Sequence, residues 1–189
     1  MFRLYRLAAA SAAVALSLGC GAAIAAGAQH TVMVGGAAMY PNRTIVQNAV
    51  HSKDHTTLVA AVKAAGLVDT LNSAGPFTVF APTNAAFAAL PEGAVASLLQ
   101  PENKATLTKV LTYHMVAGRL SAEDLIARAQ AGGGRAELTT VEGGKLIISG
   151  DSAGWWVTDE KGGRARITQT DVYQSNGVIH VVDAVLSPN

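Results

Sequence analysis

The stretch GPFTVFAPTNAAF, residues 75–87, decides the fold of this chain. A proline opens an apolar run of β-forming residues, Phe77 to Ala81, and a second proline stops it. Thr83 and Asn84 follow and can cap a helix that carries Phe87. The stretch therefore predicts a strand that leads directly into a helix.

Helical patterns dominate the segments on both sides of this stretch. Residues 44–50 can form a short helix, and a longer apolar stripe after it ends at Gly66. Residues 102–113 carry one apolar face. Ser121, with an aspartate three residues later, resembles a capping box, and it begins a helix that the triple glycine 132–134 ends.

The pattern changes to strands and tight turns from Ala136 onward. The pairs Gly143-Gly144 and Gly162-Gly163 separate segments of β-forming residues, and Asn176-Gly177 introduces a last strand, Val178 to Leu186. Helices in the first half and antiparallel strands in the second predict an α+β fold.

The last strand is predicted to be central. Residues on both faces of 178–186 are mostly apolar, which is typical of a strand covered on both sides. His180 must then satisfy its ring nitrogens inside the protein, and we expect partners in the region of Thr78, Thr83 and Asn84. This structural role is favoured over a catalytic or metal role, because charged neighbours are lacking.

Composition excludes several classes of protein. Half of the 189 residues are apolar and 14% are charged, which predicts an ordered domain. Lys and Arg number 14 against 13 Asp and Glu, so nucleic acid is not expected as the main partner. A single cysteine excludes an intrachain disulfide framework and a cysteine-rich zinc site.

The first 28 residues have the pattern of a signal peptide. Arg3 and Arg6 precede 22 uncharged residues, 11 of them alanine, and small-residue cleavage sites close the run. A permanent membrane anchor is the alternative for a run of this length, but alanine is weakly hydrophobic. A lipoprotein anchored at Cys20 is a minor alternative. We expect a secreted or periplasmic protein without a stable membrane span after cleavage.

The rest of the chain divides into two parts. Residues 29–43 contain glycines, a proline and small residues without a period, which predicts a flexible N-terminal arm. Residues 44–188 form the predicted domain.

Patterns for catalysis and metal binding are weak. His51 and His55 are four residues apart, but Ser52 stands where a zinc-protease motif has glutamate, and Ser52 and Asp54 indicate a break between the two histidines. No G-x-S-x-G motif is present, so a hydrolase is only the weakest alternative. We expect no enzyme activity, no metal and no cofactor.

Trp155 and Trp156 form the only large aromatic pair. In a strand the two rings face opposite sides of the sheet, so one can belong to the core while the other is exposed. An exposed ring near Tyr173 or the glycine turns could bind a polysaccharide or a protein.

Three segments in this order resemble the fasciclin-type (FAS1) domain. They are residues 75–87, the LTYH segment 111–114, and NGVIHVVDAVLSP at 176–188. With the helical segment 56–67, the resemblance covers Thr44 to Pro188. The run Tyr40 to Asn48 and the segment DVYQSNGVIHVVD, residues 171–183, further resemble small bacterial secreted single-domain members, including ones induced during plant symbiosis.

The resemblance implies a wedge-shaped β-sandwich flanked by several short helices, and adhesion or matrix binding outside the cytoplasm. It implies no established enzymatic chemistry. The residues that match the family's motifs in a structural role are Thr83, Asn84, Phe87, His180 and Asp183.

Tyr113 and His114 are the candidate adhesion residues. The family's adhesive activity is associated with a tyrosine-histidine segment, and both residues fall where a helix ends and could be exposed. The alternative is a histidine that stabilises the helix C-terminus through the helix dipole.

Two functions follow from these observations. The first is an exported non-catalytic adhesion module that recognises a cell-surface or extracellular-matrix component, either protein or glycan. The second is a periplasmic small-ligand-binding protein with a pocket between helices and sheet. An apolar pocket with several converging polar groups favours the second, and a flat exposed patch near Tyr113 and His114 favours the first.

Overall fold

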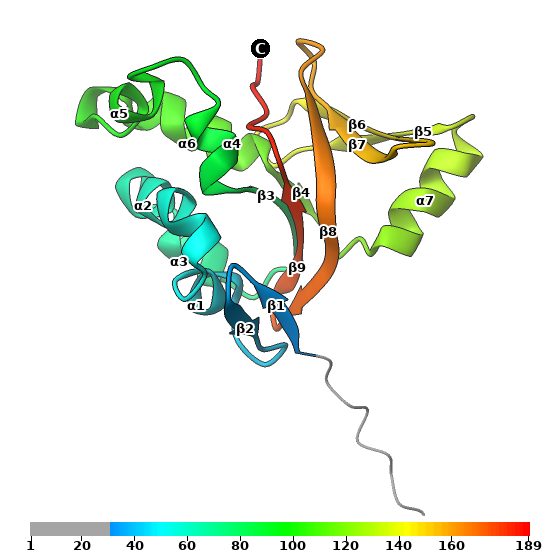
Figure 1. Ribbon diagram of the computed structural model, residues 1–189, viewed down its shortest axis with the longest axis horizontal. Coiled ribbons are helices and arrows are strands. Elements are labelled where there is room, and N and C mark those ends of the chain that lie inside the picture. Colours follow the sequence, from blue (N-terminus) through cyan, green and yellow to red (C-terminus); the bar gives the residue numbers. More distant parts are fainter. Residues whose placement is uncertain (1–30) are drawn as a thin grey trace, which may run out of the picture.

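A sheet of seven strands organises the chain, whose computed structural model describes residues 31–189 (Figure 1). The strand order is β4-β3-β9-β8-β7-β6-β5, so β9 and β8 lie at the centre. The strands are β3 (Phe77–Pro82), β4 (Met115–Ala117), β5 (Arg135–Thr139), β6 (Lys145–Asp151), β7 (Gly154–Thr158), β8 (Arg164–Gln174) and β9 (Gly177–Val182).

The long strand β8 joins two halves of this sheet. Its first residues, 164–166, pair with β7, and its later residues pair with β9, with register shifts between Ile167 and Val172. An isolated bridge between Val116 and Thr140 brings the two ends of the sheet together. The fold is α+β with a bent sheet flanked by short helices, as the sequence predicts.

Three of the predicted helix signals are found at helix ends. Thr83 caps α4 by accepting a hydrogen bond from the Ala86 N–H, and Ser121 and Asp124 form the capping box of α7. Gly66 ends α2 in the left-handed conformation. The helices are α1 (Ile45–Ala49), α2 (Thr56–Ala65), α3 (Val68–Asn72), α4 (Asn84–Ala88), α5 (Ala94–Leu98), α6 (Lys104–Tyr113) and α7 (Ala122–Ala131), with 3₁₀ turns η1 (Lys53–His55) and η2 (Pro101–Asn103).

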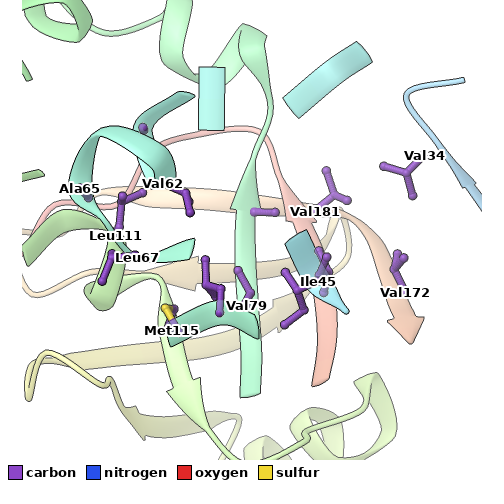
Figure 2. Close-up of a cluster of buried hydrophobic side chains, with 14 of the residues drawn as sticks. Val34, Ile45, Val62, Ala65, Leu67, Val79, Leu111, Met115, Val172 and Val181 are labelled. Atoms are coloured by element: carbon purple, nitrogen blue, oxygen red, sulfur yellow. The ribbon is translucent and has the colours of Figure 1, made fainter. Parts of the chain in front are cut away.

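Strand β9 is central, as expected, and separates two apolar clusters. It pairs parallel with β3 and antiparallel with β8, and its six residues are all buried. Val79, Val181 and Leu111 belong to a cluster between this part of the sheet and helices α1, α2, α3 and α6 (Figure 2). Phe80 and Val182 belong to a second cluster with α7 and the strands β5 to β7.

The N-terminal segment differs from the flexible arm expected over residues 29–43. It contains a hairpin of β1 (Val32–Val34) and β2 (Ala37–Met39), whose glycine turn has positive φ at Gly35. Val34 and Met39 are buried in the first cluster. The strands have three residues each, too few to establish a period, so the sequence pattern gives no strand signal.

The predicted signal peptide, residues 1–28, and Cys20 lie outside the described residues. No helix among residues 31–189 has both the length and the apolar character needed to cross a bilayer.

Candidate functional site

Tyr113, one of the two predicted adhesion residues, is buried at the end of α6. Its hydroxyl donates a hydrogen bond to the Lys145 carbonyl at 2.7 Å and accepts one from the Glu160 N–H at 3.1 Å. Burial raises the pKa of the phenol. Tyr113 therefore joins α6 to the start of β6 and to the segment after β7.

His114 is buried beside it, at the C-cap of α6. Its Nε2 accepts a hydrogen bond from the Leu186 N–H at 3.0 Å, and its Nδ1 lies 2.8 Å from the Val110 carbonyl. These partners assign the ring hydrogen to Nδ1. Burial lowers the pKa of His114 to about 4, so the ring is neutral at pH 7.

The expectation that Tyr113 and His114 are exposed is therefore wrong. Exposed fractions of 0% and 3% leave no ring surface for a partner to contact. The helix-end alternative is closer to the structure, but a neutral His114 acts through hydrogen bonds and not through charge. The C-terminal segment at Leu186 supplies its second partner from a distant part of the chain, which local sequence patterns cannot predict.

The surface next to these two side chains consists of charged groups and one apolar residue. Lys109 lies 3.7 Å from Glu142, and Lys145 lies 2.7 Å from Glu137. Val141, which precedes Glu142 in the chain, is 44% exposed, and its N–H donates to the Met115 carbonyl at 2.7 Å. We call this surface, made of Lys109, Glu137, Val141, Glu142 and Lys145, the α6-end surface.

Asn84, Phe87 and Asp183, which match the family's motifs, hold elements of the fold together. Asn84 accepts a hydrogen bond from the Thr57 N–H at 3.0 Å and donates to the Lys53 carbonyl at 2.8 Å, which joins α4 to the start of α2. Phe87 is buried. The Asp183 carboxylate accepts from the Arg166 N–H at 2.7 Å and so holds the end of β9 against β8.

His180 is fully buried, as expected of a central-strand residue. Its Nε2 lies 2.9 Å from the Leu120 carbonyl, and its Nδ1 accepts from the Asp171 N–H at 3.4 Å. Burial lowers the pKa of its ring.

The prediction that the hydrogen-bond partners of His180 lie near Thr78, Thr83 and Asn84 is wrong. In the β3–β9 register Thr78 lies opposite Val178, and His180 lies opposite Phe80, on whose ring it stacks. Thr78 instead accepts from the Leu120 N–H at 2.9 Å, so both side chains hold the same loop.

Asp171, which sequence analysis did not single out, is the third group at this loop. It lies where β8 departs from regular pairing and has a positive φ of 57°. Its carboxylate accepts from the Ala122 N–H, at the start of α7, at 2.8 Å. Aspartate tolerates the left-handed region better than most residues, but a bulge inside a strand has no clear sequence signal.

His51 and His55 do not converge. Helix α1 ends before His51, which is exposed, whereas His55 is buried and bonds to the Ser52 hydroxyl at 2.9 Å. Burial lowers the pKa of His55. Residues 31–189 contain no cluster of three or more His, Cys, Asp or Glu that could hold a metal ion.

A small apolar cavity lies between the helices and β3, where the small-ligand alternative places a pocket. Its volume is about 40 Å³, and its walls include Leu58, Val62, Val79 and Met115. The polar residues in its lining are Lys63 and His114, and both His114 nitrogens already have partners. The several converging polar groups expected of a ligand site are not found in this cavity.

The two tryptophans face opposite sides of β7. Trp155 packs against the second apolar cluster, whereas Trp156 lies on the other face of the sheet. There the Arg164 guanidinium lies 4.5 Å from the centre of the Trp156 ring. The Asp151 carboxylate lies 3.3 Å from Arg164, and the neighbouring Trp156 and Arg164 lower the pKa of this carboxyl group.

Comparisons with known proteins agree with this fold. The sequence model of the fasciclin domain matches residues 53–188. Protein sll1483 of Synechocystis sp. is 45% identical over 165 residues, which cover 85% of this chain and 82% of that protein. Immunogenic protein MPB70 of Mycobacterium bovis is 35% identical over 145 residues, which cover 74% of this chain and 66% of that protein.

A solved structure shares the fold. It is a FAS1 domain pair from the insect cell adhesion molecule Fasciclin I, with a TM-score of 0.70 and 19% sequence identity. The similarity covers 78% of this chain and 51% of that one.

Proposed function

This chain belongs to the fasciclin domain family, and from that premise we propose that it is an exported, non-catalytic adhesion module. Its partner is a protein or glycan of a cell surface or an extracellular matrix. The family match over residues 53–188 carries the proposal. The fold shared with an insect cell adhesion molecule supports it.

The cavity supports adhesion over the small-ligand alternative. Sites for organic ligands usually have volumes of at least roughly 300 Å³ and a few converging polar groups. The cavity beside Val62 and Met115 has about 40 Å³. Binding by an exposed surface therefore fits the described residues better than enclosure of a ligand, and the proposal includes no cofactor.

Tyr113 and His114 are positioning residues in this proposal. They do not touch the partner but hold the α6-end surface, because Tyr113 bonds to the backbone at Lys145 and His114 fixes the turn that leads to β4. Tyr113→Phe should remove the hydroxyl and weaken attachment while the domain stays folded. Tyr40→Phe, at an exposed ring, is the matched control. Full attachment by a folded Tyr113→Phe protein would remove Tyr113 from the proposal.

Export is proposed to remove residues 1–28, which leaves a protein in the periplasm or outside the cell. Intact-mass analysis of protein from the native host should give an N-terminus between Ala26 and Gln29. A lipid-bearing N-terminal Cys20 would support the lipoprotein alternative instead. A retained Met1 would contradict export with cleavage.

The adhesion proposal is tested by attachment of the purified protein to envelope and matrix fractions of its native environment. We expect saturable retention that native competitor protein abolishes and heat-unfolded competitor does not. Separate digestion of the fractions with protease and oxidation with periodate would distinguish a protein partner from a glycan. If the folded protein is retained by none of the fractions, the adhesion proposal fails.

A further inference from the structure

The outer face of β5 to β8 continues from the α6-end surface, with which it shares Glu137 and Lys145. Helix α7 covers the inner face of these strands (Figure 1), where the alternate side chains are buried. On the outer face, Arg135 pairs with Ser149, which lies opposite Trp156 on its other side. Trp156 is in turn opposite Arg166, so a row of four side chains crosses all four strands.

The charges of this face are unequal. Its cations are Arg135, Lys145, Arg164 and Arg166, and its carboxylates are Glu137 and Asp151. At its edge the Asp183 carboxylate accepts a hydrogen bond from the Arg166 backbone N–H at 2.7 Å. Lys145 pairs with Glu137 at 2.7 Å, and Arg164 pairs with Asp151 at 3.3 Å. Neither Arg135 nor Arg166 has an ion-pair partner within residues 31–189, and both are exposed. The face therefore has two unpaired guanidinium groups.

A hollow of about 440 Å³ lies on this face. Its lining includes the cations Arg135 and Arg164, the carboxylate of Asp151, which is paired with Arg164, and the side chains of Ile147, Ser149 and Thr158. The two hydroxyl groups can exchange hydrogen bonds with hydroxyl groups of a ligand. Strand pairing on both sides of β6 and β7 fixes these side chains on a rigid base.

We propose that this outer face of β5 to β8 binds a carboxylated polysaccharide. A guanidinium group presents parallel N–H donors that match a carboxylate, and the half-buried Trp156 offers an apolar edge to a sugar ring. Arg135 and Arg166 are three interstrand spacings apart, about 14 Å, so one chain of several sugars is needed to reach both. The inference rests on the proposed adhesion function and names the class of its partner.

The modest charge favours this partner over other polyanions. Two unpaired cations suit a chain with one carboxylate per sugar better than a densely sulfated chain or a nucleic acid, which require many phosphate or sulfate contacts.

The test measures the affinity of the purified protein for polygalacturonate by titration calorimetry. Dextran, which is neutral, and dextran sulfate are the comparison polymers. We expect binding to polygalacturonate, none to dextran, and at least about tenfold weaker binding by the Arg135→Gln/Arg166→Gln variant. The control variant Lys53→Gln/Lys104→Gln removes two exposed cations elsewhere and should bind as the wild type does.

Three results would overturn the inference. The first is equal weakening by both double variants, and the second is tighter binding of dextran sulfate than of polygalacturonate, since both indicate general attraction of charge. In the third, the wild-type protein attaches to its native envelope or matrix but does not bind polygalacturonate. This result contradicts the inference about the polysaccharide and leaves the adhesion proposal intact. If the wild-type protein attaches to neither, the adhesion proposal fails as well.

Discussion

His114 and His180 are both buried and neutral, but they carry their ring hydrogens on opposite nitrogens. His114 accepts a hydrogen bond at Nε2, and His180 accepts one at Nδ1. Each ring thus joins two segments that are distant in sequence. Truncation removes both bonds and opens a void, so His114→Ala and His180→Ala should each lower the free energy of unfolding by about 2–4 kcal/mol.

Urea midpoints of the two variants check this prediction, with the exposed His51→Ala as control. A cost below about 1 kcal/mol for His114→Ala would be typical of a helix-end histidine that acts only through the dipole. That outcome would contradict the hydrogen bonds described for His114.

Stability should also fall in mild acid because of the same rings. The pKa of His114 is about 4 in the folded state, below its ordinary value of 6.5, so the unfolded state binds more protons between these values. Above pH 6.5 the neutral His114 makes its full contribution to the free energy of unfolding. As the pH falls from 6.5 toward 4, about 3 kcal/mol of this free energy is lost progressively. His180 and His55, whose pKa values are also lowered, should act in the same direction.

Urea midpoints measured from pH 7.5 to 4.5 test this dependence. His114→Gln should flatten the slope of stability against pH, and His51→Gln should leave it unchanged. An unaltered slope in His114→Gln would show that the ring is already protonated in the folded protein or is not buried.

At the level of the elements, the β1–β2 hairpin is part of the domain and not an arm. Met39 is buried, whereas Met33 on the same hairpin is 59% exposed. Met39→Ala should therefore cost about 2–4 kcal/mol, and Met33→Ala less than about 0.5 kcal/mol. Thermal or urea unfolding of the pair measures the difference. Equal, small effects would return this segment to the role of a loose arm.

The sequence predicts those features of the helices and turns that depend only on residues close together in the chain. Helix caps at Thr83 and Ser121, the stop at Gly66 and the glycine turns all act within a few positions. The predictions that are wrong depend on contacts between residues far apart in the chain. Exposure of Tyr113 depends on the backbone at residues 145 and 160, and the partners of His180 depend on the register of β3 against β9.

The candidate surfaces illustrate the same limit. Alternation along β7 predicts that one tryptophan is core and the other is not. It does not predict that Arg135 of β5 and Arg166 of β8 lie in one row with Trp156, because strand order is a property of the assembled sheet.

At the scale of the whole molecule, the position of β8 predicts that the two halves of the sheet unfold together. It pairs with β7 in one half of the sheet and with β9 in the other, and the second apolar cluster contains residues of both halves. Unfolding followed by tryptophan fluorescence, which reports on β7, should have the same urea midpoint as unfolding followed by far-ultraviolet circular dichroism. Two separate midpoints would indicate that the halves unfold independently.

The parallel pairing of β3 with β9 also limits when this part of the sheet can form. It joins residues 77–82 to residues 177–182, one hundred positions later, so the pairing requires that residues 177–182 have been synthesised. Until then β3 lacks its central neighbour, and Val79 and Phe80 have no β9 to pack beside. A nascent chain that has not reached Gly177 therefore lacks the strand that lies between the two apolar clusters, and neither cluster is complete before β9 is made.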